Sequence, residues 1–213
     1  MGFFDAFPVP EPPEPPRRAR SRVWHEPGRN IVPATLVVDG LLVRRSELAV
    51  FASDFRVYPF GFGFAVSVLR QPRRPGGDDE LRTETPFRGD RRVRGREAER
   101  GRDLRFGVRF ADGRSAATGP GLVPPRARVV GSQPEPPLIS LRGGHGSNGF
   151  WQQMHWVWGL PEKGDLDLVY SWPAEQVPES RLELDGDVLR NAAGHAVVLW
   201  DQPEEEEDGD AAH

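Results

Sequence analysis

Apolar and polar residues alternate along several stretches of the chain with a period of two, which is typical of a β-strand that buries one face. The clearest stretch, residues 104–110, places Leu104, Phe106, Val108 and Phe110 on one face and Arg105, Gly107 and Arg109 on the other. Residues 165–172 repeat this pattern, and Pro173 ends it because proline has no backbone donor. We predict a strand in each stretch. We also expect a hairpin turn of type I′ at Asp112-Gly113, where a positive φ is tolerated.

Further strands are predicted on both sides of these two. Residues 62–68 form a third alternating face, and residues 48–57 are apolar on both sides, as suits a central strand. Residues 35–44, with Asp-Gly at their middle, indicate another hairpin. Weaker candidates lie at residues 138–142, 150–158 and 181–184. The total of about eight strands favours an all-β fold, an antiparallel β-sandwich of two packed sheets.

One short helix is predicted near the C-terminal end. Apolar residues recur there at three- and four-residue spacing behind Asp185 or Asp187, either of which is a good N-cap. Gly194 disfavours a long helix, so we expect two to three turns packed on one sheet. Residues 197–200 are a candidate for a final strand.

Three segments differ in composition from this domain. The chain contains 24 Gly and 22 Pro with 37% hydrophobic residues, so part of it is expected to lie outside the core. Residues 1–33 contain a proline-rich stretch followed by an arginine-rich one, and they are predicted to be a disordered leader. Residues 71–103 carry many charges of both signs and are predicted to be a mobile Arg-rich loop. Residues 201–213 are predicted to be a disordered acidic tail, which leaves one domain at 34–200.

The charge of the chain is unevenly distributed. The net charge is −4, but residues 201–213 hold seven acidic residues and no lysine or arginine. The preceding 200 residues therefore carry a net charge of +3. Lys163 is the only lysine among the 28 basic residues. The acidic balance of the whole chain thus comes from its last segment alone.

Composition also excludes several classes of protein. Without cysteine there is neither a disulfide framework, nor a thiolate metal site, nor a cysteine nucleophile. The first residues lack a basic start and an apolar run of signal-peptide length, and the longest apolar stretch, residues 60–69, is too short to span a bilayer. We therefore expect a cytoplasmic protein without a membrane span.

A tryptophan-rich stretch is the first candidate for a binding site. Phe150, Trp151, Trp156 and Trp158 follow a glycine-rich loop, and exposed indoles would suit a carbohydrate-binding sandwich. However, Trp156 and Trp158 share one face of a strand with Met154, and large aromatics at this period are usually core. We favour core packing, and we keep Trp151 as a possible contact with a ligand or partner.

Two further groups of side chains are candidates for a site. His145 and His155, with nearby Asp165 and Asp167, are the only group that resembles a metal or acid–base site, but their spacing matches no recognised ligand pattern. Arg92 and Arg94 belong to an arginine cluster at 91–102 that acidic residues interrupt, which disfavours nucleic-acid binding. We therefore predict no catalytic residue, metal or cofactor. His145, His155, Arg92 and Arg94 remain candidates for contact with a ligand or partner.

Two segments resemble a group of uncharacterised proteins from high-GC Gram-positive bacteria. They are FGVRFADGR at 106–114 and the text from WVWGLP at 156 to the Leu-Trp pair at 199–200. The group shares a tryptophan-rich strand, a Pro-Leu-Pro turn, a strand ending in Trp-Pro and an Ala-Ala helix ending in Leu-Trp. The resemblance covers roughly residues 35–200, although this chain has Gly159, Glu162 and Lys163 where the group has prolines. It implies a cytosolic protein and carries no activity.

Taken alone, the sequence favours a non-enzymatic binding or structural module that takes part in protein–protein interaction within an assembly. The alternative is a sandwich that binds a carbohydrate or small ligand, or a hydrolase, through the stretch from Trp151 to Trp158. Buried indoles would favour the first hypothesis, and an exposed pair of indoles beside polar groups would favour the second.

Overall fold

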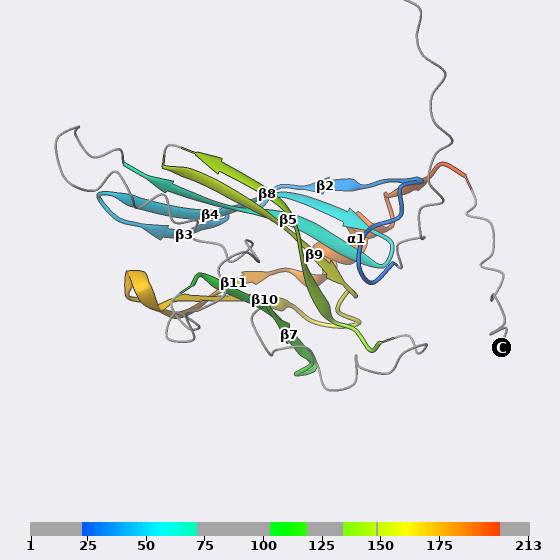
Figure 1. Cartoon of the computed structure of the whole chain (residues 1–213). Coiled ribbons are helices and arrows are strands. Elements are labelled where there is room, and N and C mark those ends of the chain that lie inside the picture. The colour runs from blue at the N-terminus through cyan, green and yellow to red at the C-terminus, as the bar shows by residue number, and fades with distance from the viewer. Residues whose placement is uncertain (1–22, 72–102, 119–133, 148, 201–213) are drawn as a thin grey trace, which may run out of the picture.

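The computed structural model describes residues 23–71, 103–118, 134–147 and 149–200 (Figure 1). Most of the predicted leader, nearly all of the predicted Arg-rich loop and the whole acidic tail lie outside these residues. Within the described ranges, no helix has the length and apolar character needed to cross a bilayer.

Two antiparallel β-sheets face each other in the described domain, which confirms the predicted all-β class (Figure 1). The larger sheet has the order β2-β4-β5-β9-β8, and β3 also pairs with β4. Its strands are β2 (Ala34–Leu36), β3 (Leu41–Arg44), β4 (Leu48–Tyr58), β5 (Gly61–Arg70), β8 (Leu138–Ser147) and β9 (Phe150–Trp158). The smaller sheet has the order β11-β10-β6-β7, from β6 (Arg105–Phe110), β7 (Ser115–Ala117), β10 (Leu166–Trp172) and β11 (Val177–Leu184).

The remaining elements are short. β1 (Ile31–Val32) and β12 (Val197–Val198) pair as a small separate sheet, and the 3₁₀ helix η4 (Pro173–Glu175) joins β10 to β11. The predicted helix is confirmed as α1 (Gly186–Ala193), which packs against β2 and β4. The side chain of Asp185 caps it by accepting a hydrogen bond of 3.0 Å from the Val188 amide.

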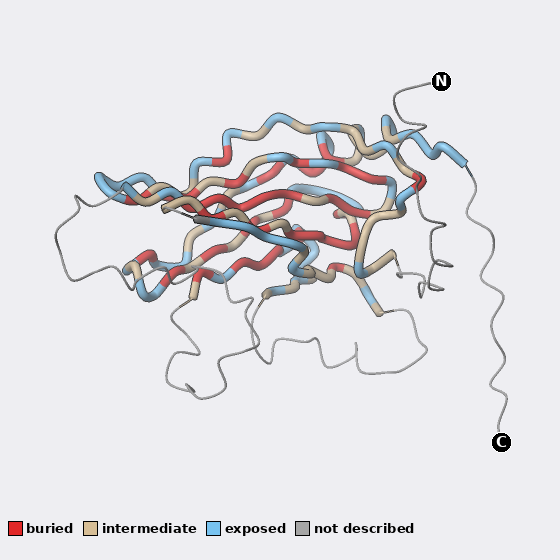
Figure 2. The backbone as a smooth tube through the Cα atoms, turned by 45° about the horizontal axis from the view of Figure 1, so that its top comes forward, coloured by how far each residue is buried: buried red, intermediate tan, exposed pale blue. Residues whose placement is uncertain are grey.

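The main core lies between the two sheets, as the buried stretches in both layers show (Figure 2). Alternate residues of β5, β6 and β10 point into it, so the register predicted from the sequence is confirmed. The ring centroids of Phe64 and Phe106 are 6.4 Å apart across the two sheets. The Tyr170 hydroxyl donates a hydrogen bond of 2.8 Å to the Leu42 carbonyl and so also links the layers.

The predicted hairpin at 35–44 is wrong, because β2 and β3 do not pair with each other. Both pair with β4, β2 at its far end and β3 near its start. β4 is long enough to pair with β2 and β3 one after the other along one edge. The chain between β2 and β3 runs close to β4 at Gly40. A Cβ on Gly40 would lie only 1.9 Å from the Ala52 carbonyl oxygen, which leaves glycine as the residue that fits.

The turn after β6 also differs from the prediction. Only Gly113 has a positive φ there, of 88°, whereas a type I′ turn needs two such residues. The Gly113 amide donates to the Phe110 carbonyl, and the Phe110 amide donates to the Arg114 carbonyl. The connection is therefore a three-residue turn with glycine in the left-handed position.

The described domain begins before residue 34, so the boundary set at 33 is too late. Ile31 and Val32 form β1, which pairs with β12 at the other end of the chain. Trp24 and Ile31 pack against aromatic residues on the outer face of the larger sheet. Two separate apolar residues show no periodicity, and Trp158, against which Trp24 packs, lies more than a hundred residues away in sequence, so no local pattern indicates this part of the fold.

Candidate functional site: an arginine-lined hollow

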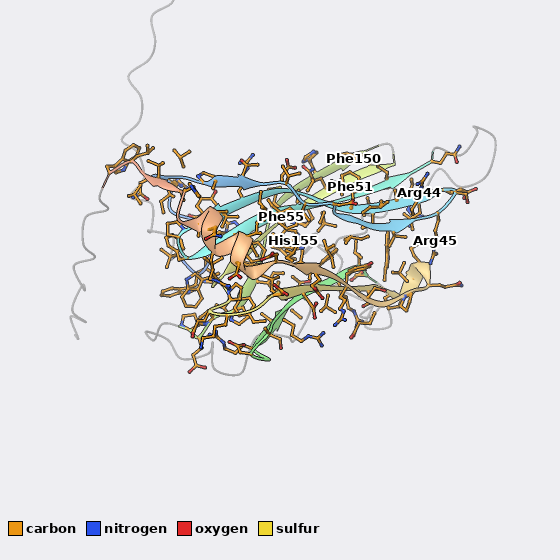
Figure 3. The ribbon with its side chains drawn as sticks, turned by 180° about the vertical axis from the view of Figure 1, so that it is seen from behind. Arg44, Arg45, Phe51, Phe55, Phe150 and His155 are labelled. Atoms are coloured by element: carbon orange, nitrogen blue, oxygen red, sulfur yellow. The ribbon has the colours of Figure 1, made fainter. Side chains whose placement is uncertain are left out.

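Trp151 and His155 were predicted contacts, and the structure places both in the core. They lie on the inner face of β9, with 8% and 2% of their surface exposed. In Figure 3 the His155 side chain lies between the two layers. Its ring stacks on Phe64 at 5.0 Å between centroids and lies 5.4 Å from Phe106. Both side chains are therefore buried between the sheets.

The environment of His155 also determines its charge. Burial lowers the pKa of His155 to about 4, against a smaller opposing effect of the Gln153 carbonyl oxygen, which lies 3.2 Å from Nδ1. The ring is consequently neutral at pH 7. It acts as a flat, largely apolar side chain between two phenyl rings.

The structure does not bring the predicted histidine and aspartate group together. His145 is exposed on β8 opposite Gln152, whereas His155 lies opposite Leu141. In the smaller sheet, Asp167 forms ion pairs with Arg109 at 2.6 Å and Arg181 at 3.6 Å. Asp165 accepts a hydrogen bond from the Gly186 amide. Within the described ranges, no group of three or more His, Cys, Asp or Glu residues could hold a metal ion.

Arg92 and Arg94, the other predicted contacts, lie outside the described residues. Their part in a site therefore stays a prediction.

The tryptophans at 156 and 158 form a second aromatic cluster, on the outer face of the larger sheet instead of between the sheets. Trp156 is 1% exposed, and its Nε1 donates a hydrogen bond of 3.1 Å to the Val23 carbonyl. Tyr58 meets it edge-on at 5.3 Å, and Trp24 lies 6.2 Å from Trp158. The N-terminal segment thus covers both indoles. Of the six tryptophans, Trp200 is the most exposed, at 61%.

Beside this cluster, the outer face of the larger sheet carries a hollow of about 410 Å³ that sequence analysis did not predict. We call it the arginine hollow. Its wall comes from the N-terminal segment and its floor from four adjacent strands, β4, β5, β9 and β8. It is lined by Glu26, Pro27, Gly28, Arg29, Ile31, Arg56, Tyr58, Gly63, Arg142, Gly143, Met154, His155 and Trp156.

Three arginines and one carboxylate supply the charge of the arginine hollow. Arg142 forms an ion pair with Glu26 and donates a hydrogen bond of 3.0 Å to the His25 carbonyl. Arg29 lies 4.0 Å from the other oxygen of Glu26 and is largely exposed. The Arg56 side chain forms no ion pair with any residue that the structure describes. The hollow therefore has an excess of positive charge, with one guanidinium available for a ligand.

The position of Arg56 depends on a β-bulge in β4. The pairing of β4 with β5 shifts between Ser53 and Arg56, and Asp54 there has a φ of 53°. The extra residue shifts the alternation by one position. As a result, Arg56 and Tyr58 point outward, whereas Phe55 and Val57 point to the core. Burial raises the pKa of Tyr58, and the charge of Arg56 opposes that shift.

Two glycines keep the floor of the arginine hollow open. A Cβ on Gly143 would meet nothing within 4 Å, and one on Gly63 would only touch the His155 carbonyl oxygen at 3.4 Å. Met154 adds an apolar surface beside them. The sequence carries no signal for this site, because its arginines come from three segments far apart in the chain and match no motif.

Such a site is suited to bind carboxylates or other anions. A guanidinium presents paired donors that match a carboxylate, and charge-assisted hydrogen bonds are stronger than neutral ones. Neither a family model, nor a curated protein, nor a solved structure matches this chain.

Proposed function

We propose that the chain is a cytoplasmic, non-enzymatic binding module whose arginine hollow holds an acidic segment of a partner protein. The observation that supports it is the convergence of Arg29, Arg56 and Arg142 on one hollow that contains a single carboxylate, Glu26. The surrounding side chains can hold and orient an anion, and they include no pair of groups arranged as an acid and a base.

An extended acidic chain suits this hollow better than a small anion does. Arg29 and Arg56 are exposed, and an ion pair at an exposed site contributes only about 0.2–1 kcal/mol. One small anion therefore gains little, whereas successive carboxylates on one chain add their contributions. A single-stranded nucleic acid would use aromatic platforms for its bases, but Trp156 and Tyr58 are buried in the aromatic cluster.

The alternative of carbohydrate binding through the stretch from Trp151 to Trp158 finds no support in the described surface. It depended on exposed indoles, and all three indoles of that stretch are buried. Sugar stacking needs an accessible indole face, which these residues do not offer.

Fluorescence anisotropy with a labelled hexaglutamate peptide tests this function. Arg56→Ala is expected to weaken binding about fivefold at low salt, which corresponds to about 1 kcal/mol. Arg44→Ala is the matched control. Arg44 is an exposed arginine at the other end of the same sheet, opposite Ala49 and about 23 Å along β4 from Arg56. Equal affinities for the two variants would refute the proposed site.

A further inference from the structure

The acidic tail, residues 201–213, leaves the described domain at the rim of the arginine hollow. The Leu199 amide donates a hydrogen bond of 2.8 Å to the Asn30 carbonyl, and the Asn30 side chain donates one of 2.7 Å to the Trp200 carbonyl. Asn30 lies between Arg29 and Ile31, which both line the hollow. Trp200, the last described residue, is therefore held beside the arginine hollow. The acidic segment begins with the next residue, Asp201.

The negative charge of the tail complements the positive charge of the arginine hollow. Residues 201–213 contain seven acidic residues and no lysine or arginine, and four consecutive glutamates occupy 204–207. The arginine hollow has three guanidinium groups against one carboxylate. Opposite charges favour association, and the attraction weakens as salt is added.

The tail is also long enough to cross the hollow. Arg56 on β4 and Arg142 on β8 are separated by three strand spacings, about 14 Å. The glutamates at 204–207 follow Trp200 by four to seven residues, so an extended chain can carry them about 13–23 Å from it, a reach comparable to the spacing of the two arginines.

We infer that residues 201–213 occupy the arginine hollow of their own chain and so compete with an acidic segment of a partner. This rests on the proposed function, because it makes the tail an autoinhibitory occupant of the same site. A short tether holds its end near the site at an effective concentration in the millimolar range. A partner must therefore bind with more contacts than the tail makes, or act on a chain whose tail is engaged elsewhere.

Competition for the hollow provides the first test. In the full chain, the combined variant Glu204→Gln, Glu205→Gln, Glu206→Gln and Glu207→Gln is expected to bind labelled hexaglutamate severalfold more tightly than the unchanged chain. The gain should disappear when Arg56→Ala is added, and Arg44→Ala should leave it intact. Equal affinity of the glutamine variant and the unchanged chain, with Arg56 still required, would overturn this inference and leave the proposed function in place.

The absence of cysteine allows a direct second test. A spin label on Gly209→Cys should broaden the amide signals of Arg29, Arg56 and Gly143 but not those of Arg44. The broadening should vanish in the glutamine variant and in about 0.5 M salt. Unchanged signals at the hollow, or broadening confined to the arginine cluster at 91–102, would refute the inference. This readout is independent of the hexaglutamate probe: if the probe failed to bind even the glutamine variant, only the proposed function would fall.

Discussion

The imidazole ring of His155 lies nearly parallel to the phenyl ring of Phe64, with an interplanar angle of 10°. The two residues face each other across β5 and β9, and both are almost completely buried. A charged imidazolium in this position would lose its hydration without gaining a carboxylate partner.

The stability of the fold is therefore expected to decrease at mildly acidic pH. The pKa of His155 is about 4 in the folded chain and about 6.5 in an unfolded one, so the unfolded state alone takes up a proton between these values. The contribution of His155 should lower the free energy of unfolding by about 3 kcal/mol as the pH drops from 6.5 to 4, and this contribution should not grow further below pH 4.

Urea unfolding of the unchanged chain and of His155→Phe, at intervals from pH 7 to pH 4, measures this effect. Carboxylates titrate in both proteins, so the difference between the two slopes isolates the histidine. Parallel slopes would show that His155 is protonated without penalty in the folded state.

The alternating stretches were predictable because each strand has one face in the core and one outside it. Phe106 and Leu168 are buried while Arg105 is exposed, as the period of two requires. The sequence also located α1, because the Asp185 cap and the buried Leu189 are local features. Information within a few residues was sufficient in both cases.

The arginine hollow was not predictable, because it depends on long-range and conformational features. Trp24 packs against Trp158, and Arg142 forms an ion pair with Glu26. In both pairs the two residues are more than a hundred positions apart in sequence. The outward direction of Arg56 depends on a bulge at Asp54, a residue type that tolerates a positive φ but does not require it. No local pattern encodes any of these relationships.

The close approach of β5 to β9 at Gly61 supports a second prediction. A Cβ on Gly61 would lie 2.3 Å from the Val157 carbonyl oxygen, which is backbone and cannot move aside easily. Gly61→Ala is expected to lower the free energy of unfolding by about 1–3 kcal/mol. Gly63→Ala, two residues along the same face, is the control, with an expected change within about 1 kcal/mol. Denaturant titration of both variants measures the two changes in the free energy of unfolding. Equal losses would contradict the close approach of β5 to β9 at Gly61.

The cover over the aromatic cluster gives a third prediction. Trp24 packs on Trp158, so Trp24→Ala should uncover part of the cluster and cost about 2 kcal/mol. Amide hydrogen exchange should rise in residues 23–32, which this packing holds on the sheet. Val37→Ala is the control, since 94% of the Val37 surface is exposed. Unchanged exchange in Trp24→Ala would mean that other contacts hold the segment in place.

The bulge in β4 supports the last prediction, because it joins the backbone to the proposed site. Asp54 has a φ of 53°, which glycine adopts freely and a β-branched residue adopts only at a cost of about 1–2 kcal/mol. Asp54→Gly should keep both stability and hexaglutamate binding, whereas Asp54→Val should lower the free energy of unfolding by that amount. Deleting residue 54 should also keep the probe bound, because it removes the extra position: Ser53 and Arg56 would then be two steps apart, as are their partners Ala65 and Gly63, so that Phe55 stays in the core and Arg56 stays outward. A deletion variant that stays folded but no longer binds the probe would show that Asp54 does more than supply the extra position.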